Sequence, residues 1–164
     1  MLKDILGRRE LYDEVKSRIK NVLGSNLVAI VVFGSTIYVG EGEDVDLVVV
    51  VNEEIDLKEK LKLEHKVRQV LQKAVRGKVF DVHIFSLEEF KENLQPGTLL
   101  SGLALGYEVI YGEEVVEPLI LNFLRKLSNE KYVLHNKYGT WDLSFHAKIT
   151  WKLRSRRALT RKGT

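Results

Sequence analysis

Three carboxylates and a glycine–serine pair are the residues of this 164-residue sequence whose types and spacing point to chemistry. Asp44 and Asp46 flank one valine at the start of the apolar run VDLVVVV, ten residues after Gly34. Asp81 lies inside a later apolar run, KVFDVHIF. Because strand side chains alternate between faces, Asp44 and Asp46 are expected to point the same way. Carboxylates within buried strands are costly unless they are paired or bind a metal.

These carboxylates converge on one patch if their two strands are neighbours in a sheet. Three oxygen donors with no His or Cys partner suit Mg²⁺ or Mn²⁺ rather than zinc. A turn at Gly34 and Ser35 would expose backbone N–H groups that suit phosphate oxygens. Together they indicate phosphoryl or nucleotidyl transfer. Taken singly, each feature also has a plain structural interpretation: solvated acids at a strand entry, an ordinary turn, or an ion-paired acid.

The elements that would position these residues are visible in the apolar periodicity. Continuous β-branched runs predict strands at 27–33, 45–52, 78–85 and 107–111. Helical spacing predicts helices at 11–23, 57–76, 98–106 and 114–127. Ser86 and Glu89 make a capping box for one more short helix. This order predicts an α/β (α+β) domain with a mixed central sheet flanked by helices. Arg68, on the second helix, is interpreted as part of a solvated face. His83, on the strand predicted at 78–85, is interpreted as a structural histidine.

Charge divides the chain into two expected regions, a body at 1–127 and a basic, helical extension at 128–164. The segment 128–142 is polar and turn-rich, and a basic helix is predicted at 143–161. Residues 143–164 hold seven bases and no acid, and without them 19 bases face 23 acids. Aromatic residues interleave with these bases, which suits contact with nucleic acid. Packing on the body and contact with the acidic segment 41–56 of a second copy, as a homo-oligomer, are the alternatives. The candidate contact residues are Lys148, Lys152, Arg154, Arg156 and Arg157.

Composition excludes several classes of protein. The sequence has no cysteine, which removes disulfides, thiolate metal sites and cysteine nucleophiles. It has no apolar stretch near 18 residues and no visible signal peptide, so no membrane span is expected and a cytoplasmic location is the default. A charged fraction of 30% with little glutamine favours a thermophile.

The motif Phe33-Gly34-Ser35, eight residues, Asp44-Val45-Asp46, and then Asp81 resembles that of the nucleotidyltransferase superfamily of DNA polymerase beta. Its minimal archaeal and bacterial members are the most similar, over about residues 10–112. The resemblance implies a nucleotidyltransferase fold in which Gly34 and Ser35 hold the β- and γ-phosphates of an NTP, ATP being favoured. It implies two Mg²⁺ (or Mn²⁺) ions on Asp44 and Asp46, with Asp81 binding the metal on the acceptor side and helping to activate the attacking hydroxyl.

The resemblance also implies an acceptor, which would be a hydroxyl of a protein partner such as a HEPN-type toxin, or of RNA. Relatives commonly carry an arginine soon after the Gly-Ser pair, whereas residues 36–40 here (TIYVG) include no base. This departure keeps a second interpretation open: a catalytically degenerate module that binds a partner protein or RNA. A third is an RNA-binding α/β domain with incidental acids.

Overall fold

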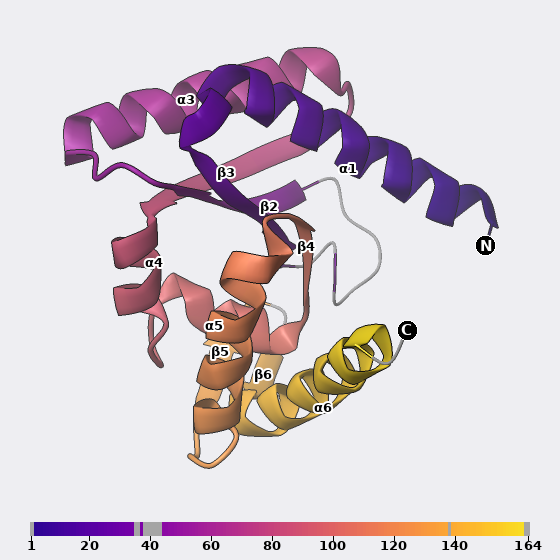
Figure 1. The fold of residues 1–164 in the computed structure, drawn as a ribbon. Helices are drawn as coiled ribbons and strands as arrows, with labels where there is room; N and C mark the ends of the chain where they lie inside the picture. Colours follow the sequence, from indigo (N-terminus) through magenta and orange to yellow (C-terminus); the bar gives the residue numbers. More distant parts are fainter. Residues whose placement is uncertain (1, 35–36, 38–43, 138, 163–164) are drawn as a thin grey trace.

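The computed structural model of the chain describes residues 2–34, 37, 44–137 and 139–162 and shows a four-stranded sheet between two layers of helices (Figure 1). The strand order is β3-β2-β1-β4. Strand β1 is antiparallel to β2 and β4, and β2 is parallel to β3. The end of β1 and the beginnings of the other three strands therefore lie at the same edge of the sheet. The strands are β1 Leu27–Phe33, β2 Asp44–Val51, β3 Val79–Ser86 and β4 Tyr107–Tyr111.

The two helical layers bury the two faces of the sheet separately. Helices α1 (Leu2–Leu23) and α3 (Leu57–Ala74) pack on the face that carries Ile30, Val45 and Leu47. The opposite face carries Val31, Val48 and Phe85 and is covered by the remaining helices. These are α4 Leu87–Asn93, the 3-10 helix η2 Leu99–Leu105, α5 Glu113–Leu127 and α6 Leu143–Lys162, while η1 Gly24–Asn26 links α1 to β1. The predicted fold class, a mixed central sheet flanked by helices, is confirmed.

Local signals in the sequence set the starts of α3 and α4. Asp56 caps α3 by accepting a hydrogen bond from the Glu59 N–H at 2.9 Å. Ser86 and Glu89 form the predicted capping box at the start of α4. Two boundaries differ from the prediction: α1 begins at Leu2 instead of near residue 11, and 99–105 is a 3-10 helix. Leu2, Ile5 and Leu6 have helical spacing, but residues 7–10 include no apolar side chain and interrupt the periodicity before Leu11.

The C-terminal segment forms a hairpin followed by the basic helix. Strands β5 (Val133–Asn136) and β6 (Gly139–Asp142) pair in the segment predicted only as turn-rich. Helix α6 follows and packs Leu143, Ala147 and Trp151 into the same core as α5 and η2. Among the described helices, none is both long enough and apolar enough to cross a membrane.

Candidate active site

The sheet brings the predicted carboxylates to one edge and one face. Asp46 lies opposite Asp81 in the parallel β2–β3 pair, so the neighbouring strands that the sequence prediction required are present. Val45 and Leu47 point into the core under α1 and α3. By alternation, Asp44, Asp46 and Asp81 lie on the opposite face, the one that α5 and α6 cover. We refer to these three carboxylates as the acid edge.

Gly34 ends β1 directly against the acid edge. Phe33 is the register partner of Asp46, and Gly34 then turns with φ +83°. A Cβ atom at Gly34 would lie 2.1 Å from Asp46 Oδ2, so no other residue fits without displacing that carboxylate. The turn continues as the Ile37 N–H donates to the Gly34 carbonyl at 3.0 Å. Ser35, the other predicted phosphate-binding residue, lies outside the described residues.

The pKa of Asp46 reflects the closeness of the three carboxylates. Burial, followed by the charges of Asp81 and Asp44, raises the pKa of Asp46, against the opposing effects of His83 and Lys137. Lys137 lies in the turn between β5 and β6, which the sequence prediction treated as part of a boundary. The charges at the acid edge thus repel one another, as expected of carboxylates arranged to bind a cation.

The side chain of Asp81 is 55% exposed and has two neighbours that can carry positive charge. His83 Nε2 lies 3.3 Å from Asp81 Oδ2, and Arg68 Nη2 lies 3.8 Å from Oδ1. Arg68 Nε also donates to the Phe80 carbonyl at 3.2 Å. The sequence interpretation of Arg68 as part of a solvated face is therefore wrong, because α3 crosses from β2 to the parallel β3 and packs along it. A β-α-β connection in the predicted element order was the available signal.

The donor set at the acid edge fits a hard divalent cation in part. In the described ranges, no three Asp, Glu or His side chains are grouped closely enough to hold a metal ion. Asp46 and Asp81, in register on adjacent strands, supply carboxylate oxygens from two sides. Mg²⁺ usually takes one or two carboxylates and completes its octahedron with water and substrate phosphates. The residues therefore fit a cation that arrives with a phosphate substrate.

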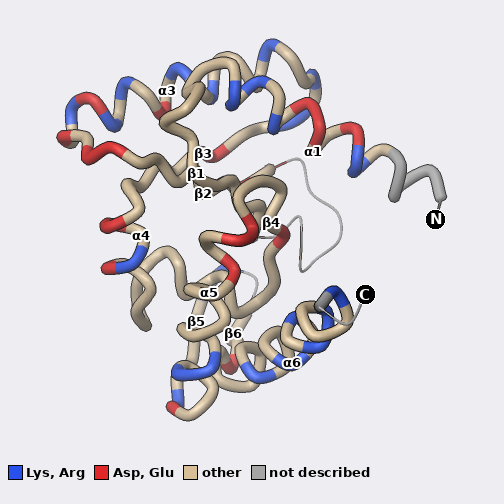
Figure 2. The backbone as a smooth tube through the Cα atoms, in the orientation of Figure 1, with Lys and Arg blue, Asp and Glu red and all other residues tan. Residues whose placement is uncertain are grey.

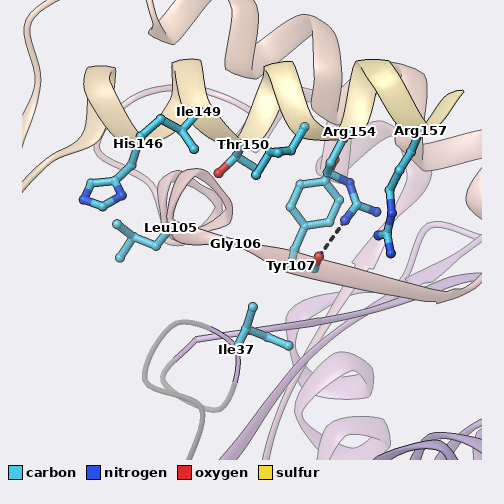
Figure 3. A pocket seen from close by; sticks show the side chains of 10 residues that line it. Ile37, Leu105, Gly106, Tyr107, His146, Ile149, Thr150, Arg154 and Arg157 are labelled. Carbon is cyan, nitrogen blue, oxygen red and sulfur yellow. Dashed lines mark hydrogen bonds between the residues drawn. The ribbon is translucent and has the colours of Figure 1, made fainter. Parts of the chain in front are cut away.

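The bases of α6 divide into a bound group and an exposed group. Arg154 makes two hydrogen bonds to Glu117, at 2.6 and 3.1 Å, and donates from Nη1 to the Tyr107 carbonyl at 2.8 Å (Figure 3). Its guanidinium also stacks on the Tyr107 ring at 3.9 Å. We call Arg154, Glu117 and Tyr107 the helix clamp. It joins α6 to α5 and β4, so Arg154 serves the packing of the helix.

The remaining candidate bases of α6 are exposed, and Figure 2 shows Lys and Arg positions in blue along the helix. Arg161 pairs with Glu113 at 2.7 Å. Within the described part of the chain, no salt bridge joins the other four to an acid. These four are Lys148, Lys152, Arg156 and Arg157.

Comparison with known proteins gives structural likeness only. Neither a protein-family model nor a curated protein matches the sequence. One chain of the structure of the tri-AMPylated Shewanella oneidensis HEPN toxin in complex with MNT antitoxin is 14% identical. The match covers 74% of this chain and 87% of that chain, with a TM-score of 0.48. A toxin–antitoxin structure with AMP-PNP is 15% identical, with 72% and 87% covered and a TM-score of 0.49.

A third solved structure is the spectinomycin adenyltransferase AAD(9) from Enterococcus faecialis with ATP and spectinomycin. It is 18% identical, with 74% of this chain and 68% of that chain covered and a TM-score of 0.45. At these identities and scores, nothing about the activity, substrate or partner of this chain follows from the likeness.

Proposed function

We propose that the chain is a Mg²⁺-dependent nucleotidyltransferase that transfers NMP from an NTP to a hydroxyl acceptor and releases pyrophosphate. The observation that carries this proposal is the contact between Gly34 and Asp46. A glycine turn pressed against a carboxylate offers backbone N–H groups for phosphate beside an oxygen ligand for a cation. Asp81, in register on the next strand, adds a second ligand at the same place.

Each residue then has a role. Asp44 and Asp46 would hold two divalent ions, Mg²⁺ or Mn²⁺, and Asp81 one of them on the acceptor side. Bound there, such ions supply charge neutralisation at the phosphates and a lower pKa for the attacking hydroxyl. Gly34 and Ser35 would bind the β- and γ-phosphates. The acceptor oxygen forms a bond to the α-phosphorus, the bond to the bridging oxygen breaks, and pyrophosphate leaves.

The hydroxyl proton goes to Asp81, the carboxylate on the acceptor side. His83, at 3.3 Å, holds that carboxylate in place by a hydrogen bond when its Nε2 carries a proton. Asp81 lies on β3, an edge strand of the sheet, and its side chain is 55% exposed, so a large acceptor can reach it from solvent. A protein side chain, as with a HEPN-type partner, or an RNA 3′ end fits this open route.

The missing base after Gly34 is compensated in part by cations from other elements. Lys137 comes from the β5–β6 turn and acts electrostatically on Asp46. Arg68 comes from α3 and lies at Asp81. Either cation offsets phosphate charge without belonging to the Gly-Ser segment. ATP remains the favoured donor among the NTPs.

One observation favours a second function, a degenerate module that binds RNA or a partner protein. Residues 36–40 have no base, and α6 presents four exposed bases instead. Such a module would bind nucleic acid through α6 in a salt-dependent manner. It would release no pyrophosphate.

The test is calorimetric titration with ATP, CTP, GTP and UTP, with and without Mg²⁺, on wild type and Asp44→Asn/Asp46→Asn. We expect Mg²⁺-dependent binding of at least one NTP, lost in the double variant. The matched control is Glu53→Gln/Glu54→Gln, which removes two exposed acids at the other end of β2 and should bind as wild type does. Pyrophosphate release with a supplied protein or RNA acceptor should fall by roughly 10²-fold or more in the Asp variant, since metal ions contribute several kcal/mol. Equal NTP binding by all three proteins would remove the acid edge from the mechanism.

A further inference from the structure

A second basic segment directly precedes Asp81 in the sequence. Residues 65–80 hold five bases and no acid. They form the second half of α3, the turn after it and the beginning of β3, and Figure 2 shows Lys and Arg positions in blue along α3. Because the segment ends at Asp81, its positive charge adjoins the acid edge. The five bases are Lys66, Arg68, Lys73, Arg76 and Lys78.

The exposed side chains of this segment can all donate hydrogen bonds. In the fully described stretch 65–78, the exposed residues other than Gly77 are three bases, two glutamines and one histidine, and none is apolar or acidic. Those within α3 are separated by one, three or four residues, which places them on one side of the helix. The apolar residues Val67 and Leu71 lie between them in sequence and are buried. We call this surface the α3 face, and its members are His65, Lys66, Gln69, Gln72, Lys73 and Arg76.

Two cations of the α3 face have no counterion in the protein. Lys73 and Arg76 make no ion pair with any residue in the described part of the chain. Lys66 lies at the border of the face, because it also lines a pocket with three glutamates. A cation in the last turn stabilises a helix, which accounts for Lys73. Arg76, however, follows the end of α3 at Ala74. The charge that remains indicates an anionic ligand from outside the protein.

The phosphate backbone of a nucleic acid matches the α3 face. Phosphodiester oxygens accept hydrogen bonds, and Lys, Arg and Gln are among the side chains that contact them. From His65 to Lys73 the helix rises about 12 Å. Each strand of a duplex carries a phosphate about every 3.4 Å, so cations two turns apart can each meet a phosphate.

Other anionic partners need features that the α3 face lacks. A protein interface has an apolar core, and a helix that lies on a membrane inserts an apolar side, whereas the exposed residues of the α3 face are polar or charged. Binding of single strands relies on aromatic side chains that stack on bases. Residues 65–79 include no Phe, Tyr or Trp. The face therefore favours a duplex, which is contacted through its backbone.

We propose that the α3 face binds the phosphate backbone of a nucleic-acid duplex and makes no sequence-specific contacts. This inference goes beyond the proposed function and does not depend on it, since such binding requires neither a metal ion nor an NTP. Arg68, on the same helix, contacts Asp81, so a duplex on the α3 face lies beside the acid edge on the acceptor side. The exposed bases of α6 form a separate surface, because α3 and α6 pack on opposite faces of the sheet.

The experiment measures binding of a labelled RNA hairpin and a DNA hairpin of the same sequence by fluorescence anisotropy, over a range of salt concentrations and without Mg²⁺ or NTP. The test variant is Lys73→Gln/Arg76→Gln. Both side chains are exposed, so the fold should persist, and circular dichroism checks this. The matched control is Lys58→Gln/Lys62→Gln, which removes two exposed lysines from the first half of α3. A second control, Lys152→Gln/Arg156→Gln, removes two exposed bases from α6.

We expect wild type to bind a hairpin with an affinity that falls steeply as salt is added. In the test variant, the slope of log K against log salt should become shallower by about 1.8, because each neutralised phosphate contributes about 0.9. Its Kd at moderate salt should rise about tenfold or more. Both controls should keep the slope and the Kd of wild type. Equal binding of RNA and DNA would indicate contact with phosphates alone, and a preference for RNA would indicate additional contact with 2′-hydroxyls; either result supports the proposal.

Three outcomes would overturn the proposal. Wild type that binds neither hairpin has no such surface. The same loss in either control variant as in the test variant would show that the α3 face has no special part in binding. Binding of polyglutamate or of phosphatidylserine vesicles as tight as that of the hairpins, with the same loss in the test variant, would assign the face to a protein or a membrane instead. The proposed function is tested apart from all three, because this assay contains no Mg²⁺ and no NTP.

Discussion

The acid edge and the helix clamp use charged side chains on the same face of the sheet in opposite ways. In the clamp, Arg154 and Glu117 are 11% and 12% exposed, and each satisfies the other through two short hydrogen bonds. At the acid edge, Asp46 faces two further carboxylates, and its pKa is raised by burial and by their charges. Opposite charges are thus matched where α6 is attached, and like charges are gathered where the strands begin.

This difference is the one expected between a structural cluster and a candidate ligand site. A buried ion pair that is fully hydrogen-bonded needs nothing from outside the protein. A group of carboxylates that repel one another is stabilised when a cation binds, so its cost in the free protein indicates a ligand. The following predictions test this contrast, beginning with the largest expected effect.

The helix clamp should dominate stability. Arg154→Ala would leave the Glu117 carboxylate buried without its partner, and we expect the free energy of unfolding to fall by about 3–5 kcal/mol. Urea unfolding followed by circular dichroism measures this change. The variant Arg154→Met/Glu117→Leu removes both charges and should recover most of the loss.

Arg161→Ala is the matched control for the clamp. Arg161 lies on the same helix and pairs with Glu113, but the two side chains are 66% and 44% exposed. Its replacement should cost less than about 1 kcal/mol, as for other surface pairs. Equal losses for Arg154→Ala and Arg161→Ala would mean that burial of the clamp contributes nothing.

At the acid edge, the expected change in the free energy of unfolding has the opposite sign, because removal of a negative charge there stabilises the metal-free protein. The pKa of Asp46 is raised in the folded state, so the folded state holds that proton more tightly than the unfolded chain does. The contribution of Asp46 to stability therefore falls as the pH rises from its unfolded value, about 3.9, through the raised folded pKa, and is constant above it. Asp46→Asn should be more stable than wild type above this window and lose the advantage below it.

The effect of Mg²⁺ on thermal stability provides a second test of Asp46. Under the proposed function, the cation should raise the melting temperature of wild type at pH 7 and leave that of Asp46→Asn nearly unchanged. Thermal unfolding at several pH values, with and without Mg²⁺, measures both effects. An Asp46→Asn variant that is less stable than wild type at pH 7 without metal would contradict the picture of a repulsive acid edge.

The sequence predicted the acid edge far better than the helix clamp. A carboxylate within a β-branched apolar run conflicts with burial, and the sequence alone shows this conflict at Asp44, Asp46 and Asp81. The clamp joins residues 37 positions apart on two helices, and nothing local marks Arg154 among the other bases of α6. Its pairing depends on how α6 packs against α5, which is a tertiary property.

The same reasoning explains the other differences between prediction and structure. The strands and most helices follow from apolar periodicity, which records local burial. The described side chains of the four-residue strands β5 and β6 are exposed or half-buried, so the hairpin lacks the apolar alternation that predicts strands. Ile37, Gly106 and Ile149 line one pocket although they belong to three segments that are far apart in the sequence. No local spacing in the sequence predicts that these three segments pack together.

The smallest predicted effect concerns Arg68, a cation placed at the acid edge itself. Its pair with Asp81 spans 3.8 Å between partly exposed side chains, so Arg68→Gln should change the free energy of unfolding by less than about 1 kcal/mol. Because the guanidinium competes with a metal ion for Asp81, the variant should bind Mn²⁺ a few times more tightly, as calorimetry would show. Arg18→Gln removes a comparable surface pair, with Glu14 on α1, and should leave Mn²⁺ affinity unchanged. Weaker Mn²⁺ binding by Arg68→Gln would instead mean that Arg68 holds Asp81 in its binding position, and the acid edge would then depend on a matched pair as the helix clamp does.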